Sequence, residues 1–244
     1  MKLKKNQFDS KVAKYWDELI NWNRRFRSEK NFLSKILKKH SCRTVLDVAT
    51  GTGFDSILLS RQGFNVTSID SSNNMLREAE KNFKIYKIKP KLKLLDWKNL
   101  YKINKKFDAI ICLGNSLACE LNNSSRFEAI KNFNLVLKKN GIVIIDHRNY
   151  EEYQKTIIKK KNFYYLNSKV KIVSRIINHI NEKITLFTYT LDSKKNFFLK
   201  MFPIQLNYIF KIFKENNFQL IKTLKDRKIY CKNPSFYLHV FRKK

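Results

Sequence analysis

Gly51, Gly53 and Asp70 have the residue types and spacing of a site for a nucleoside. The two glycines follow an apolar run at residues 44–49 and suit a sharp turn that leaves room for a molecule against the backbone. Asp70 ends the next apolar run, about 20 positions further on, where a carboxylate can accept hydrogen bonds from ribose hydroxyls. This combination of strand, glycine turn, helix and acid-terminated strand favours a nucleoside-bearing cofactor over a purely structural turn.

Alternating strand and helix patterns position these residues. Strands are predicted at residues 44–49, 65–69, 91–96, 107–113 and 141–146, and helices at residues 55–62, 73–83 and 126–138. Ser71 or Ser72 is suited to cap the helix that begins at residue 73. The alternation is typical of an α/β fold with a doubly wound parallel sheet and helices on both of its faces.

The segments on either side of this unit differ in character. Residues 11–39 are expected to be helical in two pieces, and residues 163–200 alternate strand-like runs with polar turns, which predicts an inserted antiparallel β patch. A helix at 205–216 and strands at 219–224 and 236–241 follow. We divide the chain into an N-terminal helical cap or lid (1–40), a cofactor-binding core (41–150), a substrate-side insertion (151–203) and a C-terminal part that completes the core sheet (204–244).

Composition constrains the setting of the protein. The 244 residues are enough for one domain with an insertion, and no apolar run approaches a membrane span. The N-terminus has a basic start but no apolar stretch typical of a signal peptide. The four cysteines lack CxxC spacing, which favours reduced thiols in a cytoplasmic protein over a zinc site or a disulfide framework. We expect no metal.

The formal charge of +31 raises the question of a nucleic-acid partner. The lysines are spread along the whole chain and accompany many Asn, Ile, Phe and Tyr residues, the set that AT-rich codons encode. Codon composition therefore accounts for the charge without selection for a polyanion. We expect nonspecific attraction to polyanions in vitro, but no specific nucleic-acid partner and no membrane partner.

In a parallel sheet, ligands bind beyond the carboxyl ends of the strands. The candidates at those ends are residues 49–53, Asp70, Asp96 with Trp97, residues 113–116 and residues 146–150. Three segments among them, DVATGTGFDS, VTSID and LLDW, resemble the cofactor loops of class I S-adenosylmethionine-dependent methyltransferases. That resemblance implies a Rossmann-like, mostly parallel sheet of seven strands.

A closer resemblance rests on the pair ICLGNS and IDHRNY, together with YWDELINW, MFP and FYLHV. With these motifs, from about Phe8 to Phe241, the chain resembles the glycine N-methyltransferase family, and within it the bacterial glycine/sarcosine N-methyltransferases that start betaine synthesis. The resemblance implies transfer of methyl groups from S-adenosyl-L-methionine to the amine of glycine, sarcosine or both.

The resemblance also assigns roles to single residues. Residues implied to bind the cofactor are Trp16, Arg25, Ala49, Gly51, Gly53, Asp70, Asp96, Trp97 and Leu113. Among them, Arg25 would pair with the methionine carboxylate, Asp70 would hold the ribose, and Asp96 and Trp97 would contact the adenine.

Residues implied to serve the substrate are Asn115, Arg148, Tyr165 and Tyr189. Arg148 would hold the substrate carboxylate, because a guanidinium binds a carboxylate in a fixed two-pronged geometry. Asn115 would orient the substrate amine. The purely structural alternatives are that Arg148 is an ordinary surface arginine, that Asn115 belongs to a turn, and that the two tyrosines only pack in the core or on the surface.

Two positions depart from the family. A tyrosine is usual where this chain has Phe8, and a histidine where it has Cys119. These departures leave open the identity of the methyl acceptor, which could also be dimethylglycine or another small amine. They also leave open a catalytically impaired cofactor-binding protein. A nucleic-acid methyltransferase is the third alternative, although the expected Asn/Asp-Pro-Pro-aromatic turn is replaced by Leu-Gly-Asn-Ser. We expect a monomer or weak homodimer.

Overall fold

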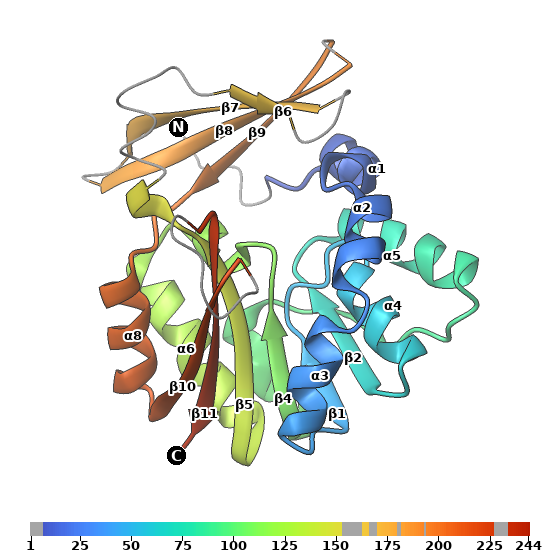
Figure 1. The fold of residues 1–244 in the computed structure, drawn as a ribbon, viewed down its shortest axis with the longest axis vertical. Helices are drawn as coiled ribbons and strands as arrows, with labels where there is room; N and C mark the ends of the chain where they lie inside the picture. The colour runs from blue at the N-terminus through green and yellow to red at the C-terminus, as the bar shows by residue number, and fades with distance from the viewer. Residues whose placement is uncertain (1–6, 153–162, 166–169, 180–181, 193, 227–233) are drawn as a thin grey trace.

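A seven-stranded sheet forms the centre of the protein. The computed structural model describes residues 7–152, 163–165, 170–179, 182–192, 194–226 and 234–244 (Figure 1). The strand order is β10-β11-β5-β4-β1-β2-β3. The strands are β1 (Thr44–Asp47), β2 (Asn65–Asp70), β3 (Leu92–Leu94), β4 (Phe107–Cys112), β5 (Leu137–Arg148), β10 (Phe218–Lys225) and β11 (Phe236–Lys243). Only β11 runs in the opposite direction to the other six strands, so the predicted doubly wound, mostly parallel sheet is confirmed.

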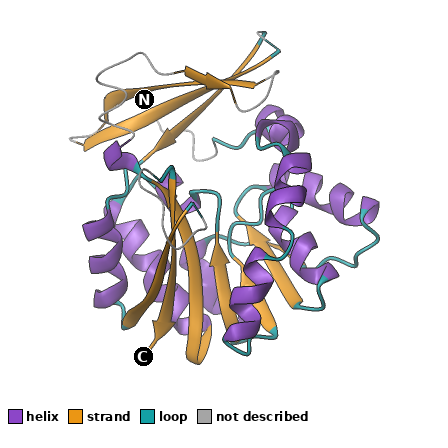
Figure 2. Ribbon diagram, viewed as in Figure 1, coloured by secondary structure: helices purple, strands orange, loops and turns teal. Residues whose placement is uncertain are grey.

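Helices cover both faces of this sheet (Figure 2). The helices are α1 (Ser10–Leu19), α2 (Trp22–Glu29), α3 (Phe32–Lys39), α4 (Phe54–Arg61), α5 (Asn73–Ile85), α6 (Asn123–Val136) and α8 (Leu206–Glu215), with 3-10 helices η1 (Trp97–Ile103) and η2 (Ser116–Cys119). Successive residues of β1 are buried on opposite faces, Val45 against α3 and Leu46 against the larger cluster with α6 and α8. Burial on both sides explains the continuous apolar runs of the central strands.

The predicted antiparallel patch forms a separate four-stranded sheet. It contains β6 (Phe163–Tyr165), β7 (Val170–His179), β8 (Glu182–Leu191) and β9 (Lys195–Met201), in that spatial order. Figure 1 shows this second sheet above the carboxyl ends of β4 and β5. Phe187, Leu199 and Met201 of the second sheet belong to the same hydrophobic cluster as the central strands. The insertion is therefore packed onto the end of the sheet where ligands bind in α/β folds.

Several boundaries differ from the sequence expectation, and three of the differences are the clearest. The N-terminal region is three helices rather than two pieces, because Asn21 adopts a left-handed conformation (φ 54°) and begins a new helix. β3 ends at Leu94 instead of Asp96, since Asp96 caps η1 through its carboxylate. β5 begins at Leu137, earlier than predicted, because Leu137 already pairs with Phe107 of β4. Ser72 is the cap of α5, as one of the two expected positions.

No helix in the described part of the chain is long and apolar enough to cross a membrane. Within the same residues, no group of three or more His, Cys, Asp or Glu side chains is arranged to hold a metal ion.

Candidate active site

The glycine turn lies where the strand order reverses, between β1 and β4. Gly51 and Gly53 have φ values of +54° and +98°, which favour glycine. The Asp70 carboxylate accepts hydrogen bonds from the amides of Gly51 (2.9 Å) and Ser72 (2.8 Å). Burial raises the pKa of Asp70, and these amide donors oppose that effect. Because a carboxylate has about four acceptor positions, Asp70 keeps capacity for ribose hydroxyls, so this turn fits a nucleoside cofactor.

The N-terminal segment covers this turn. A Cβ atom added to Gly51 would lie 3.6 Å from Nε1 of Trp16. The Trp16 ring is contacted edge-on by Phe8 at a centroid distance of 5.4 Å, and the Phe8 carbonyl accepts a hydrogen bond from Ser72 Oγ at 2.9 Å. Trp16 and the departure at Phe8 are therefore both brought next to the cofactor loop.

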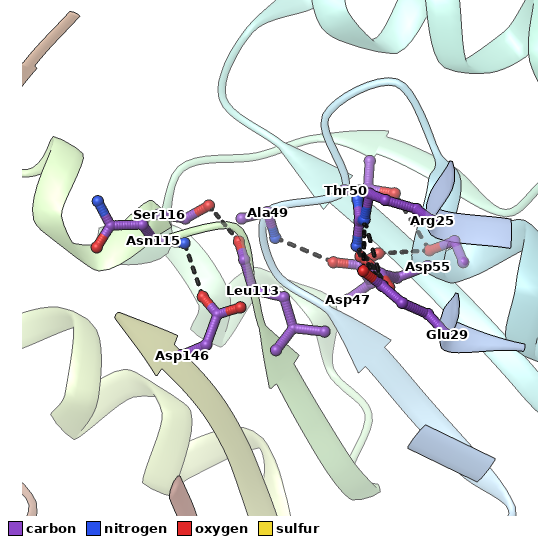
Figure 3. A network of polar contacts seen from close by, with 11 residues as sticks. Arg25, Glu29, Asp47, Ala49, Thr50, Asp55, Leu113, Asn115, Ser116 and Asp146 are labelled. Carbon is purple, nitrogen blue, oxygen red and sulfur yellow. Dashed lines mark hydrogen bonds and ion pairs between the residues drawn. The ribbon is translucent and has the colours of Figure 1, made fainter. Parts of the chain in front are cut away.

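Arg25 is held by two carboxylates of the protein (Figure 3). Its Nη2 lies 3.0 Å from Glu29 and 3.1 Å from Asp55, and its guanidinium stacks on Phe54 at 4.0 Å. Burial alone would lower the pKa of Arg25, but Asp55 and Glu29 raise it. A cofactor carboxylate would have to compete with these two acids for the guanidinium. The i,i+4 spacing from Arg25 to Glu29 is visible in the sequence, whereas no sequence signal points to Asp55.

Asp47 lies beneath the glycine turn at the end of β1. Its carboxylate accepts hydrogen bonds from Ser56 Oγ at 2.6 Å and from the Ala49 amide at 3.3 Å. Burial raises the pKa of Asp47 to about 7, against the lowering effect of the Ser56 hydroxyl. This buried acid holds the backbone of Ala49, a residue expected to border the cofactor.

Asp96 and Trp97 lie at the start of η1. The Asp96 carboxylate accepts a hydrogen bond from the Lys98 amide at 3.1 Å. Trp97 Nε1 donates to the Val48 carbonyl at 2.6 Å, and its ring meets Phe133 edge-on at 5.9 Å. Trp97 thus fastens η1 to the carboxyl end of β1, and contact of either residue with an adenine stays a prediction.

Asn115 lies on the acceptor side of the site, the side where Arg148 is expected to hold the methyl acceptor. The backbone amide of Asn115 donates a hydrogen bond to the buried carboxylate of Asp146 at 2.7 Å (Figure 3). Two residues earlier, the Leu113 carbonyl accepts a hydrogen bond from Ser116 Oγ at 2.6 Å. Asn115 Oδ1 accepts from the Arg148 amide at 3.1 Å. Asn115 Nδ2 donates to Tyr150 Oη at 2.7 Å and lies 3.0 Å from Met201 Sδ. The Asn115 side chain therefore joins β5 to the end of β9.

Arg148 ends β5 between the two sheets. Its guanidinium carbon lies 4.8 Å from the ring centroid of Phe236 and 5.1 Å from that of Phe187 in the second sheet. A planar guanidinium between aromatic rings keeps its hydrogen-bonding edge directed within the plane, as recognition of a carboxylate requires. The sheet packing thus brings Arg148 and Asn115 together, as their positions at adjacent strand ends predict.

Tyr189, Tyr165 and Cys119 are the remaining predicted positions near the site. Tyr189 is buried in the hydrophobic cluster beside Phe187, and β6 ends at Tyr165, whose side chain lies outside what the structure describes. Cys119 lies on η2, with Sγ 4.0 Å from the Asn115 carbonyl, and burial raises the pKa of its thiol to about 12. The second departure therefore places a neutral thiol beside the acceptor side.

Tyr150 lies within the candidate range 146–150 but was given no role, and Met201 was not among the candidate residues. Tyr150 closes the IDHRNY motif, so its position carried a signal. Met201 lies 86 positions from Asn115 in the chain, and only the packing of β9 onto η2 brings them together.

Comparisons with known proteins agree with this geometry. The family described as "Methyltransferase domain" matches residues 45–141. The glycine/sarcosine N-methyltransferase of Parasynechococcus marenigrum is 38% identical over 93% of this chain and 81% of its own. That of Aphanothece halophytica is 36% identical over 98% of this chain and 90% of its own.

A solved structure of an S-adenosylmethionine-dependent methyltransferase from Clostridium acetobutylicum superposes with a TM-score of 0.76 at 23% identity, covering 96% of this chain and 98% of its own. That likeness shows the fold, the class I methyltransferase fold implied by the cofactor loops. S-adenosyl-L-methionine is the methyl donor that this fold and the methyltransferase domain use here. With identities above one third over most of both chains, the protein belongs to the glycine/sarcosine N-methyltransferase family.

Proposed function

We propose that the protein methylates the amine of glycine, sarcosine or both, as in the first steps of betaine synthesis. The observation that carries the proposal is the position of Arg148, held at the end of β5 between Phe187 and Phe236 and tied through its amide to Asn115. A guanidinium in an aromatic setting, beyond the strand ends, suits the carboxylate of a small amino acid. The names of these two relatives support the same substrates.

In this proposal the bound S-adenosyl-L-methionine supplies an electrophilic methyl group on its sulfonium. Asp70 binds the ribose hydroxyls, and the turn at Gly51 and Gly53 admits the cofactor against the backbone. Arg148 binds the substrate carboxylate and Asn115 fixes the backbone of Arg148. Catalysis then comes from orientation of the reactants and from exclusion of water by the aromatic side chains.

The acceptor amine must be neutral to attack the methyl group. No dedicated general base is assigned among the site residues, so we expect activity to rise from neutral to alkaline pH as free amine becomes available. A flat profile over that range would point to a base within the site.

A methyl-transfer assay over glycine, sarcosine, dimethylglycine and bulk tRNA, with products identified by mass, tests the proposal. We expect sarcosine from glycine, dimethylglycine from sarcosine, or both. Methylated tRNA alone would establish the nucleic-acid alternative, which the charge of +31 favours. Binding of S-adenosylhomocysteine without any methylated product would indicate an impaired enzyme.

The proposal extends to the partners, the cellular location and the oligomeric state of the protein. We propose a small amino acid as the only specific partner, a cytoplasmic location, and a monomer or weak homodimer. Light scattering coupled to size exclusion would measure the oligomeric state, and a stable tetramer would contradict it.

A further inference from the structure

Arg126 is a buried cation at the start of α6, outside the site described above. Its side chain has 0% exposure, and no carboxylate in the described part of the chain pairs with it. Nε donates to Tyr208 Oη at 2.8 Å and Nη1 donates to the Glu120 carbonyl at 2.8 Å. Nη2 lies 3.5 Å from Asn123 Oδ1. A buried guanidinium held only by neutral groups is costly, so its location calls for a specific role.

The face of this guanidinium stacks on Phe202. The guanidinium carbon lies 3.6 Å from the Phe202 ring centroid and 5.3 Å from that of Tyr208 in α8. Phe202 directly follows β9, so it is the point where the second sheet returns to the core. The Phe202 amide donates to the Ala118 carbonyl of η2 at 2.7 Å. Arg126 therefore clamps the junction between the two sheets from the side of α6 and α8.

The same junction carries a contact to the acceptor side of the site. Met201, the residue before Phe202, places Sδ 3.0 Å from Asn115 Nδ2, and the Asn115 Oδ1 accepts from the Arg148 amide. A shift of Phe202 away from η2 would move Met201 and release Asn115. The path from Arg126 to Arg148 thus runs through the stack on Phe202, the covalent neighbour Met201 and two hydrogen bonds of Asn115.

We propose that Arg126 is a positioning residue for the methyl acceptor. It acts by holding the Met201–Phe202 junction against η2, which keeps Asn115 and Arg148 in register, and it touches neither substrate nor cofactor. The cofactor loop at Gly51 and Asp70 is built from other elements, so the clamp affects cofactor binding far less than it affects the acceptor. The kinetic part of this inference rests on the proposed function.

Kinetics of Arg126→Lys and Arg126→Met test the inference, with Lys131→Met as a control that removes an exposed cation from the same helix. We expect kcat/KM for the acceptor to fall by about tenfold or more in both Arg126 variants, because small displacements of positioning groups are costly. The Kd of S-adenosylhomocysteine should stay within about twofold. Thermal destabilisation with unchanged acceptor kinetics in the folded variants would overturn the inference.

A milder variant and a substrate-independent measurement guard against misfolding. Tyr208→Phe keeps the ring and removes the hydroxyl, which accepts from Arg126 Nε and donates to Asn123 Oδ1 at 2.8 Å. Its effect should be smaller, in the same direction, and less than additive with Arg126→Lys. Hydrogen exchange of the Phe202 amide should be faster in Arg126→Lys than in the wild type. If the wild type methylates neither glycine nor sarcosine, the proposed function fails, whereas unchanged exchange at Phe202 would refute the clamp itself.

Discussion

The side chains of Asp70 and Asn115 are oriented by hydrogen bonds to other groups of the protein. Asp70 is bound by two backbone amides, and Asn115 uses both ends of its amide group on the protein. Such saturation restricts the rotamers of groups that face the ligands, which reduces the entropy lost when a ligand binds. Arg25 differs because its partners are charged: Glu29 and Asp55 pair with its guanidinium before any ligand binds.

Arg148→Lys should lower kcat/KM for glycine by about 10- to 100-fold, because an ammonium cannot reproduce the two-pronged contact with a carboxylate. The affinity for S-adenosylhomocysteine, measured by calorimetry, should change little. Arg242→Lys, an exposed arginine on neighbouring β11, is the matched control and should retain activity. Loss of cofactor affinity in Arg148→Lys would mean that its role has been assigned to the wrong ligand.

Asp70→Asn should weaken S-adenosylhomocysteine binding by about tenfold or more, since a hydrogen bond to a charged acceptor is replaced by a neutral one. Asp108→Asn is the control at the opposite end of the sheet, where Asp108 accepts from the amides of Arg43 (3.0 Å) and Thr44 (2.7 Å). This control should lower stability yet leave the calorimetric affinity unchanged. Equal losses of affinity in both variants would show a general structural effect.

The connection from β1 to α4 is the element that defines the cofactor site. Gly53 caps α4 with φ +98°, and its α-hydrogen side faces α5, where an added Cβ would lie 3.1 Å from Phe83 Cε2. A larger residue would therefore push α4 and α5 apart. Two causes therefore favour glycine at this position: the positive φ and the close approach of α4 to α5.

Gly53→Ala and Gly63→Ala separate these two causes. Both glycines have positive φ, but nothing lies within 4 Å of a Cβ built on Gly63. Gly63→Ala should cost only the backbone term of ~1–2 kcal/mol, whereas Gly53→Ala should lose a further ~1–3 kcal/mol from overpacking. Urea unfolding measures both, and S-adenosylhomocysteine affinity should fall in Gly53→Ala alone. Equal stability of the two variants would mean that Phe83 moves aside freely.

At the scale of the whole molecule, a chain of buried polar groups joins β10, β11 and β5 at one edge of the sheet. Thr223 on β10 donates to His239 Nδ1 at 2.9 Å, and His239 and His147 share a hydrogen bond between their Nε2 atoms at 3.0 Å. His147 Nδ1 donates to the Arg148 carbonyl at 2.9 Å. Burial lowers the pKa of His147 to about 4, and burial with the neighbouring His147 lowers that of His239 to about 3.

These lowered pKa values make stability depend on pH. Below pH 6.5 the unfolded chain binds protons at both histidines that the folded protein does not, so their contribution to stability falls as pH decreases toward 4. Asp47, with its raised pKa, changes stability in the opposite direction over this range. Comparing the wild type with His239→Gln cancels the Asp47 contribution because both proteins contain it.

We expect the stability advantage of the wild type over His239→Gln to shrink by roughly 2 kcal/mol between pH 6.5 and 4.5. Urea unfolding at these two pH values measures the difference. A constant difference would mean that His239 takes up its proton equally in the folded and unfolded states.

The strands of the core were predictable because their apolar runs are local and buried on both faces. The run at residues 107–113 became β4 with an end shifted by one residue, and the glycine turn followed β1 as expected. The break at Asn21 was not predictable, since a left-handed asparagine depends on how α1 and α2 pack. The roles assigned to single site residues remain predictions that ligand binding must test.

The sequence by itself determined the fold class and the nucleoside part of the cofactor, because glycine turns and acid-terminated strands are local patterns that recur wherever a nucleotide-like ligand meets a parallel sheet. The resemblance of the cofactor loops then indicated S-adenosyl-L-methionine. The partners of each site residue were decided only by the tertiary structure. Asp55 reaches Arg25 across 30 positions and Met201 reaches Asn115 across 86. Contacts between such distant segments depend on how helices and sheets pack, and no local periodicity records that packing.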